Sequence, residues 1–506
     1  MSAPHKDQSA PNGLELGREQ ARVLQVLGNW AAGQGPLYRR LARALRSAID
    51  RGDLPPGLRL PPERVLARSL SVSRSTVVAA YDVLERDDVL DRRQGSGTRI
   101  LEGRSRQIPA ERPALSQTLG RNTLFRRIVD GPDGTIDFLG AYLVGRGGLP
   151  RSVLAGLDRE LARLSEGSGY TPLGYPPLRQ AIADHLTHTG LPTAPEQVLV
   201  TSGAQQAIQL AGWQFLQPGD TALVENPTYP GALDAFSAAG GRLAWVPTGR
   251  QGADVERLSD LVPRTSARLL YLIPTFQNPT GGVMSEHRRR AVARLVEARA
   301  IPLVEDESLA MLALEEGRAP PPIAAFAPGA PILTIGSLSK LFWGGLRVGW
   351  IRAPAPLIAH LARLKAVADL GGSLPGQVIA TRLLEHFEVV RRERCAELAR
   401  RFALMSELLE QHLPAWSWER PLGGLCLWVR LPRGTAAEFA QVALRHGVSL
   451  VAGPVASADN SFAEFLRLPF GLEPSVMEEG VQRLARAWQA YVPLVEPERQ
   501  ALTVIV

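Results

Sequence analysis

The chain has 506 residues, more than one hydrophobic core normally supports, which predicts two to four domains. Its composition, 45% hydrophobic and 21% charged, is ordinary for a globular protein, and it contains no apolar run near the 18 residues that a membrane helix needs. Two cysteines, Cys395 and Cys426, exclude a disulfide framework and a cysteine-rich metal site, and the polar start lacks the apolar stretch of a secretory signal. We therefore expect a cytoplasmic protein that binds no metal, and the net charge of +7 weakly suggests a polyanionic partner.

Composition divides the chain into four segments. Residues 1–35 open with a polar stretch and are expected to be a flexible N-terminus, and residues 36–102 form a compact arginine-rich segment. Residues 103–135 mix proline, glycine, arginine and serine without periodicity, which predicts a linker. Over residues 136–495, short apolar runs such as "QVLVTS", "TALVEN" and "IPLVEDE" alternate with helical stretches. This alternation predicts an α/β fold with a mostly parallel central sheet.

The 36–102 segment contains three predicted helices. Apolar residues recur at helical spacing from Leu37 to Arg51, a second short helix is expected over Pro62–Leu70, and Ser73 is a suitable N-cap for a third. The last two helices are joined by three residues, which predicts a helix-turn-helix. In that geometry the side chains that begin the second helix of the motif face the major groove of DNA; they are Arg74, Ser75 and Thr76.

A predicted hairpin follows the helices. In "VLDRRQGSGTRIL" two β-prone arms flank a glycine-rich tip, and Arg92, Arg93 and Arg99 lie beside that tip. Residues 36–101 contain 13 arginines and 8 acidic residues, so +5 of the total charge of +7 falls in this segment. The alternative interpretation, a helical bundle with a solvated basic face, stays open at this point.

The segment resembles, over its whole length, the winged helix-turn-helix domain of GntR-family bacterial repressors. The resemblance implies double-stranded operator DNA as the partner. With the groove-facing residues, the expected DNA contacts are Arg39 or Arg40, Arg64, Ser73, Arg74, Ser75, Thr76, Arg93 and Gly97. One departure is Asp88, which stands where the family usually has the glycine that precedes the wing; aspartate tolerates the left-handed conformation better than most residues.

Lysine is rare in this chain. Of the 57 basic residues only Lys6, Lys340 and Lys365 are lysines, and the other 54 are arginines. A lysine amine can lose its proton and attack a carbonyl, whereas an arginine guanidinium cannot. Lys6 and Lys365 are interpreted as surface residues. Lys340 follows the predicted buried strand "PILTIGS" in a serine- and glycine-rich turn, which makes it a candidate for covalent chemistry.

Other residues near predicted strand ends would suit a phosphorylated aldehyde bound to Lys340. Arg347 and the backbone amides of Gly203, Ala204 and Gln205, at a predicted helix start, could hold phosphate. Asp306 could pair with a ring nitrogen, Tyr229 could stack on a flat ring, and Asn278 could bond a ring hydroxyl. Taken singly, each is also compatible with an unpaired surface residue or an ordinary turn. Together they lie where open α/β sheets bind ligands.

The order and spacing of these residues resemble the fold-type I aminotransferases, over roughly residues 136–493. The resemblance implies pyridoxal 5'-phosphate as the cofactor, a Schiff base at Lys340, Asp306 on the pyridine nitrogen, Asn278 on the 3-oxygen and Tyr229 stacked on the ring. It adds Ser337 to the phosphate ligands, Tyr170 as a ligand to the partner subunit's phosphate, and Arg467 as the clamp of a substrate carboxylate. Ser308 departs from the family, which usually has tyrosine there, and this puts transaminase turnover in doubt.

Both halves together resemble the MocR subfamily of transcriptional regulators, which implies a homodimer. The leading hypothesis is a DNA-binding regulator that senses an amino compound, or pyridoxal phosphate itself, through a Schiff base at Lys340. A working aminotransferase with an accessory DNA-binding domain is the alternative, because Lys340 and Arg467 are both present. A DNA-binding protein that uses its second domain only as a dimer scaffold also stays open. The effector, the operator and the sign of regulation are not specified by the sequence.

Overall fold

The computed structural model describes residues 35–70, 72–93, 97–101, 134–143, 151–315, 317 and 319–492, together with 23–24, 26–27 and 30–31. The predicted linker therefore lies almost entirely outside the described residues. Contacts divide the chain into two compact units. The first comprises Met1–Asp137, Leu431–Leu450 and Gln482–Val506, and the second comprises Phe138–Arg430 and Val451–Val481. Since this division cuts across 136–495, the domain boundaries expected from the sequence stay a prediction.

The N-terminal part of the first unit has the predicted helix-turn-helix and wing. Its elements are α2 (Leu37–Asp50), β1 (Arg59–Leu60), α3 (Glu63–Ser69), α4 (Arg74–Arg86), β2 (Leu90–Arg93) and β3 (Gly97–Ile100). The three strands form an antiparallel sheet in the order β1-β3-β2, and Leu90 pairs with Ile100 at the base of the wing. Ser73 caps α4 as expected, because its hydroxyl accepts from the backbone N–H of Thr76. Asp88 has φ 54°, so aspartate does occupy the left-handed position before the wing.

The core of this domain joins the helices to the sheet. Leu41, Leu45, Val77 and Tyr81 are fully buried within one hydrophobic cluster, and the Tyr81 hydroxyl donates to the carbonyl of Pro61 at 2.9 Å. The same cluster contains residues from the stretch expected to be a flexible N-terminus; they are Val23, Leu24, Val26, Leu27 and Trp30. The sequence prediction of a flexible stretch did not anticipate that these apolar side chains are buried.

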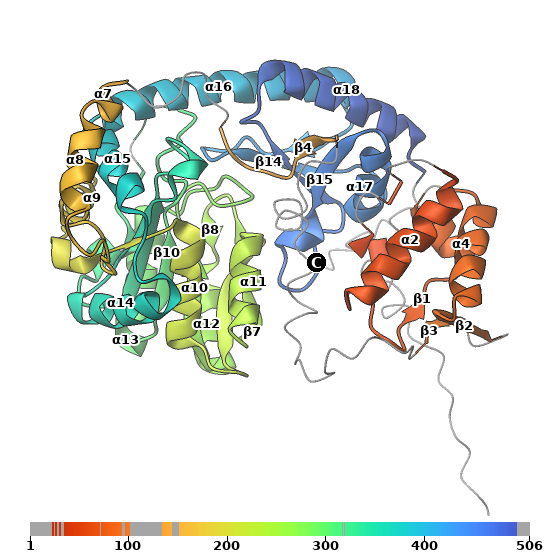
Figure 1. Ribbon diagram of the computed structural model, residues 1–506, viewed down its shortest axis with the longest axis horizontal. Coiled ribbons are helices and arrows are strands. Elements are labelled where there is room, and N and C mark those ends of the chain that lie inside the picture. The colour runs from red at the N-terminus through yellow and green to blue at the C-terminus, as the bar shows by residue number, and fades with distance from the viewer. Residues whose placement is uncertain are drawn as a thin grey trace, which may run out of the picture. The chain divides into compact units, whose positions relative to one another are not determined.

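The second unit is built on an eight-stranded sheet with the order β5-β12-β11-β10-β9-β6-β7-β8 (Figure 1). The strands β11, β10, β9, β6 and β7 are parallel, and β12 and β8 run antiparallel to their neighbours. The strands are β5 (Val198–Thr201), β6 (Thr221–Asn226), β7 (Arg242–Gly249), β8 (Gly252–Ala253), β9 (Ala267–Leu272), β10 (Leu303–Asp306), β11 (Ile332–Ser337) and β12 (Gly349–Arg352). This confirms the predicted mostly parallel α/β fold.

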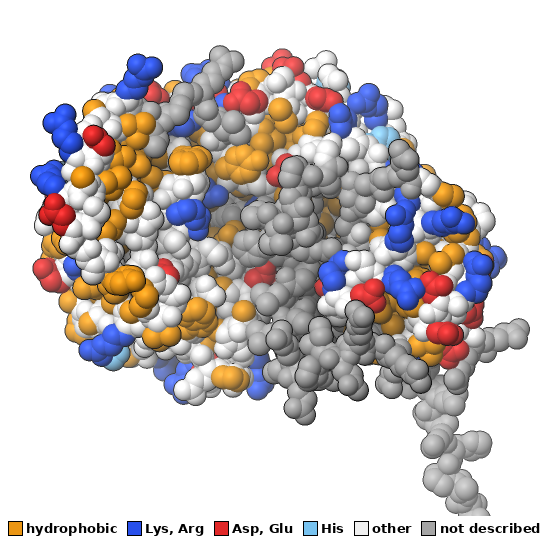
Figure 2. All heavy atoms as spheres, in the orientation of Figure 1, with side chains coloured by type: hydrophobic (Ala, Val, Ile, Leu, Met, Phe, Trp, Pro, Cys, Tyr) orange, Lys and Arg blue, Asp and Glu red, His pale blue; other side chains and the backbone are white. Residues whose placement is uncertain are grey.

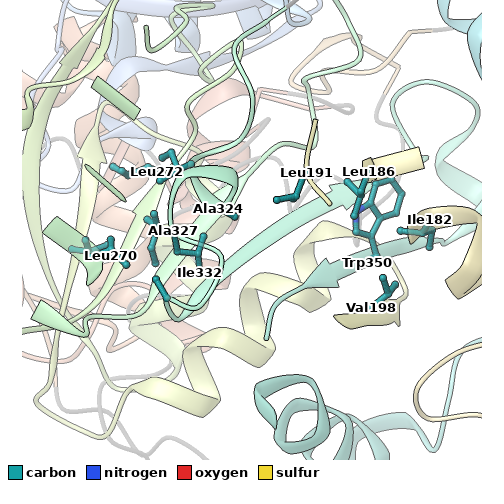
Figure 3. Close-up of a cluster of buried hydrophobic side chains, with 14 of the residues drawn as sticks. Ile182, Leu186, Leu191, Val198, Leu270, Leu272, Ala324, Ala327, Ile332 and Trp350 are labelled. Atoms are coloured by element: carbon teal, nitrogen blue, oxygen red, sulfur yellow. The ribbon is translucent and has the colours of Figure 1, made fainter. Parts of the chain in front are cut away.

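Successive side chains of a strand point to opposite faces of the sheet, and apolar side chains stand on both faces. Helices therefore cover both faces of this sheet. Val198, Leu270 and Ile332 belong to one core cluster (Figure 3), whereas Leu199 and Leu269 belong to another. The first cluster packs against α9 (Pro176–His188), α12 (Val255–Thr265), α13 (Glu286–Arg299), α15 (Leu374–Leu384) and η2 (Ile323–Phe326). The second packs against α10 (Ala204–Phe215), α11 (Pro230–Ala238) and α14 (Ala355–Asp369).

A second sheet has five strands in the order β13-β14-β16-β15-β4. These are β4 (Ile136–Phe138), β13 (Ser417–Trp418), β14 (Cys426–Arg430), β15 (Val448–Ala452) and β16 (Phe465–Pro469). The remaining helices are α7 (Arg151–Leu154), α8 (Leu157–Leu164), η1 (Pro195–Gln197), η3 (Gly344–Leu346), α16 (Phe387–His412), α17 (Ala436–Arg445), η4 (Gly453–Ala456) and α18 (Pro474–Ala490). In the described part of the chain, no helix has both the length and the apolar character to cross a membrane.

Candidate cofactor site and DNA-binding surface

Lys340 lies three residues after the end of β11, on a side chain that is partly buried. Its Nζ donates to the carbonyl of Ala141 at 2.8 Å. Burial, followed by the nearby Arg467 guanidinium, lowers the pKa of Lys340 to about 8, because both disfavour a second positive charge there. At pH 7 roughly a tenth of this amine is therefore unprotonated, far more than for an ordinary lysine, and this is the form that attacks a carbonyl.

Asp306 ends β10 with both carboxylate oxygens held by neighbours. The Tyr271 hydroxyl donates to Oδ2 at 2.7 Å, and the backbone N–H of Ser308 donates to Oδ1 at 2.9 Å. Burial and the carboxylate of Asp306 raise the pKa of Tyr271 well above its ordinary value, so this tyrosine stays a donor. Sequence reasoning missed Tyr271 because it stands inside the apolar run "LLYLIP", where a tyrosine reads as a core residue. A carboxylate fixed in this way is suited to a ring N–H.

Asp306 and Arg467 both lie within electrostatic reach of Tyr229. Burial and the Asp306 carboxylate raise the pKa of Tyr229 to about 12, and the Arg467 guanidinium acts in the opposite direction. Arg467 is 1% exposed and donates to the carbonyl of Leu139. Its buried Nε has no hydrogen-bond partner among the described residues. A buried cation with an N–H group to spare is a candidate anion subsite.

The start of α10 has the features of a phosphate cradle. Gly203 has φ 120° and precedes a helix that no side chain caps, so the first-turn amides have no intrahelical partner. A Cβ at Gly203 would lie 3.6 Å from a guanidinium nitrogen of Arg347, which places that cation beside the turn. A Cβ at Gly349 would approach the Gly203 Cα to 2.8 Å, so β12 and the turn pack at glycine-only distance. Ala204 and Gln205 supply the next two amides.

Asn278 and Ser337 are placed at the same edge of the sheet by the loop after β9 and by the end of β11. The Asn278 Oδ1 lies 3.8 Å from the Sγ of Cys426, whose electrostatic partners include Lys340 and Arg467. Cys426 was interpreted as a packing residue; it is buried, and it also lines this region. The Ser337 hydroxyl accepts from the backbone N–H of Ser339 at 3.2 Å.

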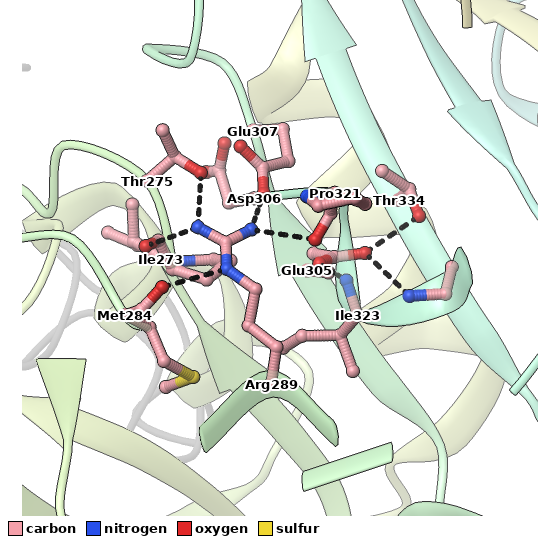
Figure 4. A network of polar contacts seen from close by, with 12 residues as sticks. Ile273, Thr275, Met284, Arg289, Glu305, Asp306, Glu307, Pro321, Ile323 and Thr334 are labelled. Atoms are coloured by element: carbon pink, nitrogen blue, oxygen red, sulfur yellow. Dashed lines mark hydrogen bonds and ion pairs between the residues drawn. The ribbon is translucent and has the colours of Figure 1, made fainter. Parts of the chain in front are cut away.

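A buried arginine ties the loop that carries Asn278 to the strand that carries Asp306 (Figure 4). Arg289 on α13 is 0% exposed, and its donors reach the carbonyls of Pro274 and Met284, both at 2.9 Å. It also bonds the Thr275 hydroxyl at 2.8 Å and the Glu307 carboxylate at 3.1 Å. Sequence reasoning missed this residue, since one arginine among many on a helix gives no signal of burial.

The residues expected to bind cofactor thus occupy one edge of one sheet, with the exception of Tyr170. Tyr170 is 67% exposed, and its expected role is toward a partner subunit rather than toward its own site. The structure fits a phosphorylated pyridine aldehyde in three respects. An amine of lowered pKa, a fixed carboxylate and an uncapped helix start with an adjacent arginine are present together. Buried polar atoms without partners among the described residues follow strands of this sheet; they are Gln205 Oε1, Thr228 Oγ1 and Ser308 Oγ, and Arg467 Nε on β16 of the second sheet also has none.

The start of α4 presents an exposed polar surface. Ser73, Arg74 and Ser75 are exposed and Thr76 is half-buried, and the Ser73 hydroxyl lies 2.8 Å from those of both Ser75 and Thr76. Arg64 on α3 is also exposed. These groups are available for contact with DNA.

Other expected DNA contacts differ in their surroundings. Arg39 is exposed, whereas Arg40 donates to the carbonyl of Ala31 at 2.6 Å and is turned toward the protein. The side chain of Arg93 lies outside the described residues. Gly97 has φ 82°, and a Cβ there would lie 2.7 Å from the guanidinium of Arg59, a wing neighbour that the sequence analysis did not single out.

One of the wing arginines is engaged within the domain. Arg92 forms an ion pair with Asp82 at 2.7 Å, donates to the carbonyl of Val78 and stacks over Tyr81, so it braces the wing against α4. Arg92 is therefore a structural residue of the wing rather than a free basic group.

The fold and the site together define a class of protein, a fold-type I aminotransferase-like body joined to a winged helix-turn-helix domain. Residues 140–484 match the family model for aminotransferase class I and II, and residues 37–100 match the model for bacterial regulatory proteins of the gntR family. The chain belongs to the aminotransferase class I and II family, and with its gntR-family domain it has the architecture of the MocR subfamily.

Individual relatives agree with both halves. The chain is 32% identical to the HTH-type transcriptional regulator YisV of Bacillus subtilis, over 78% of this chain and 84% of the relative. It is 28% identical to the probable rhizopine catabolism regulatory protein MocR of Rhizobium meliloti, over 89% and 94%. Among solved structures, it is similar to LysN, the α-aminoadipate aminotransferase of Thermus thermophilus, in complex with N-(5'-phosphopyridoxyl)-L-leucine. That match has a TM-score of 0.67 and 31% identity, and it covers 75% of this chain and 98% of LysN.

Proposed function

We propose that this chain is a pyridoxal phosphate-dependent transcriptional regulator that senses an amino compound, or the cofactor itself, at Lys340. Its gntR-family domain binds double-stranded DNA. The observation that carries the proposal is the partly buried Lys340 amine with a pKa of about 8, beside Asp306 and Arg467, in a chain that also has an exposed helix-turn-helix start. Since operators are reached inside the cell, we assign the protein to the cytoplasm.

Different side chains hold the cofactor and the effector. When bound, pyridoxal phosphate supplies an aldehyde that an unprotonated amine attacks, with a carbon–nitrogen double bond formed and water released. Lys340 provides that amine, and Asp306 holds the ring N–H. Arg347 and the α10 amides of Gly203–Gln205 hold phosphate, with Ser337 nearby, while Tyr229 and Asn278 bind the ring. Arg467 pairs with an effector carboxylate, which favours an amino acid over a simple amine.

A homodimer is part of the same proposal. Contiguous exposed apolar patches mark interaction surfaces, and several large exposed apolar side chains belong to segments near the site; they are Tyr170, Leu173, Trp343, Val367 and Leu370. Figure 2 shows hydrophobic side chains gathered over the part of the second unit that contains α9 and α14. A second copy that covers this surface would bring the partner's Tyr170 to the phosphate. Sedimentation of the purified protein tests this state directly.

The test of sensing joins spectroscopy to DNA binding. We expect an absorbance band of bound cofactor in the purified protein, a shift of that band with a subset of amino acids, and a change of DNA affinity with the same subset. The Lys340→Ala variant should lose all three responses but still bind DNA. If that variant keeps the ligand-dependent change of DNA affinity, sensing does not depend on Lys340 and the proposal fails.

A second candidate function is a working aminotransferase with an accessory DNA-binding domain. It is favoured by the fixed Asp306 carboxylate and by Arg467, which a transaminase would also need. Against it, position 308 has a serine where the family usually has a tyrosine. Ser308 offers Asp306 only a backbone N–H, and its own buried Oγ has no partner among the described residues. Sustained keto-acid production with excess amino donor and acceptor identifies the enzyme, whereas a single stoichiometric spectral change identifies the sensor.

A further inference from the structure

Lys365 is buried, so its interpretation as a surface residue was wrong. It lies near the end of α14, its side chain is 1% exposed, and its Nζ pairs with Asp369 Oδ1 at 2.8 Å. Burial of an ammonium group is costly unless a partner compensates. The partner is itself unusual, because a carboxylate in the last residue of a helix is disfavoured by the helix dipole. An ion pair kept in this position points to a role other than helix stability.

Asp369 connects α14 to the turn before α10. Its Oδ2 accepts from Gln206 Nε2 at 2.7 Å, and Gln206 Oε1 in turn accepts from the backbone N–H of Ser202 at 2.8 Å. Ser202 directly precedes Gly203, whose amide begins the candidate phosphate cradle. Gln206 thus occupies the N–H of Ser202 but not the amides of Gly203, Ala204 and Gln205, which are the expected phosphate donors.

The same carboxylate also holds a second loop. Asp369 Oδ1 accepts from the backbone N–H of Gly371 at 2.9 Å. Gly371 has φ 134°, and a Cβ there would lie 3.0 Å from backbone atoms of Thr171, so this loop packs tightly on the residue after Tyr170. Asp369 therefore holds, through Gln206, the turn that begins the candidate phosphate cradle, and it holds directly the loop that packs beside Tyr170.

We propose that Lys365 and Asp369 are positioning residues of the phosphate subsite. Lys365 neutralises and orients the Asp369 carboxylate; Asp369 orients Gln206; and Gln206 sets the backbone of the 202–205 turn. A lysine suits this role because its ammonium group is a compact point charge, whereas a planar guanidinium needs more space and more acceptors. The inference rests on the proposed function, since it takes the anion held by the turn to be the phosphate of pyridoxal phosphate.

The test compares pyridoxal phosphate with pyridoxal, which lacks only the phosphate. In the full-length protein, Kd for each is measured by absorbance titration, and the ratio of the two values reports the phosphate subsite alone. Lys365→Met and Gln206→Leu should each weaken pyridoxal phosphate binding about tenfold, the effect of roughly one lost hydrogen bond to a charged group, and leave pyridoxal binding unchanged. Gln206→Leu keeps the buried ion pair, so it reports on the connection even if Lys365→Met does not fold.

Arg363→Met is the matched control, because Arg363 is an exposed cation on the same helix. It should leave the ratio at the wild-type value. An unchanged ratio in Gln206→Leu overturns the inference, as does an equal loss of both ligands, which would indicate general damage to the fold. If the wild-type protein binds neither compound, it is the proposed function that fails.

Discussion

At the scale of single residues, the rarity of lysine distinguishes residues that supply only positive charge from residues with a chemical role. Where the chain needs only positive charge it uses arginine, and the two lysines that the structure describes are both removed from bulk solvent. Lys340 has its pKa lowered to about 8 by burial and by Arg467, whereas Lys365 is held in an ion pair with Asp369. The first could be recognised from the sequence by its turn; the second could not, because its partner Asp369 is four residues away on the same helix, a spacing that gives no sign that tertiary packing buries Lys365.

The lowered pKa predicts how cofactor attachment depends on pH. A lysine amine reacts only when it is unprotonated, so the rate of attachment should rise with pH to a plateau, with a midpoint near 8 instead of the ordinary value near 10.4. Stopped-flow absorbance between pH 6 and 10 measures this midpoint. Arg467→Gln should move it upward, because a nearby positive charge is removed. A midpoint above 10 in the wild-type protein would contradict the account.

At the scale of elements, the strands were predictable and the contacts between their ends were not. The strands β5, β10 and β11 are buried along their whole length, so they stand out as continuous apolar runs, and the residues after them fall at one edge of the sheet. Tyr271 on Asp306 and Arg289 on Glu307 join residues that are 35 and 18 positions apart. No local pattern encodes such pairs. A related reason applies to Val23 and Trp30, which lie in the stretch expected to be flexible but are buried by tertiary contacts.

Arg289 supports a prediction about stability. Arg289→Met should reduce the free energy of unfolding by about 3–5 kcal/mol, because it leaves the Glu307 carboxylate buried without its cation and removes the side-chain donor from the Met284 carbonyl. Its neighbour provides the control: Arg290 pairs with Glu286, but both side chains are about half exposed. Arg290→Met should cost under ~1 kcal/mol. Urea unfolding followed by fluorescence measures both. Equal losses of unfolding free energy would show that Arg289 does not hold the loop of Asn278 to the strand of Asp306.

The start of α4 supports a prediction about DNA. Arg74→Ala should weaken binding to DNA fragments selected by the wild-type protein by about 1–3 kcal/mol if Arg74 contacts a base edge. Arg86→Ala, which removes an exposed arginine from the last turn of the same helix, is the control and should have little effect. Fluorescence anisotropy at fixed salt compares the two. If both variants bind like the wild-type protein, α4 does not enter the groove as its exposure suggests.

At the scale of the whole molecule, two functions are carried by one chain whose halves are each recognisable. The gntR-family domain supplies DNA binding, and we propose that the aminotransferase-like body supplies a site for an amine. For binding at Lys340 to regulate transcription, the ligand must favour one conformation of the molecule over another by its differential affinity. The sequence predicts both halves because each has local motifs. It does not encode the coupling between them, which depends on conformations that no short motif describes.

The central claim is a covalent bond between pyridoxal phosphate and the Lys340 amine, and borohydride reduction followed by peptide mass spectrometry tests it most directly. The chain offers only Lys6, Lys340 and Lys365 as side-chain amines, so the modified site can be assigned without ambiguity. The account predicts a stoichiometric phosphopyridoxyl group on the peptide that contains Lys340. An unmodified Lys340, or a label distributed over Lys6 and Lys365, would contradict it.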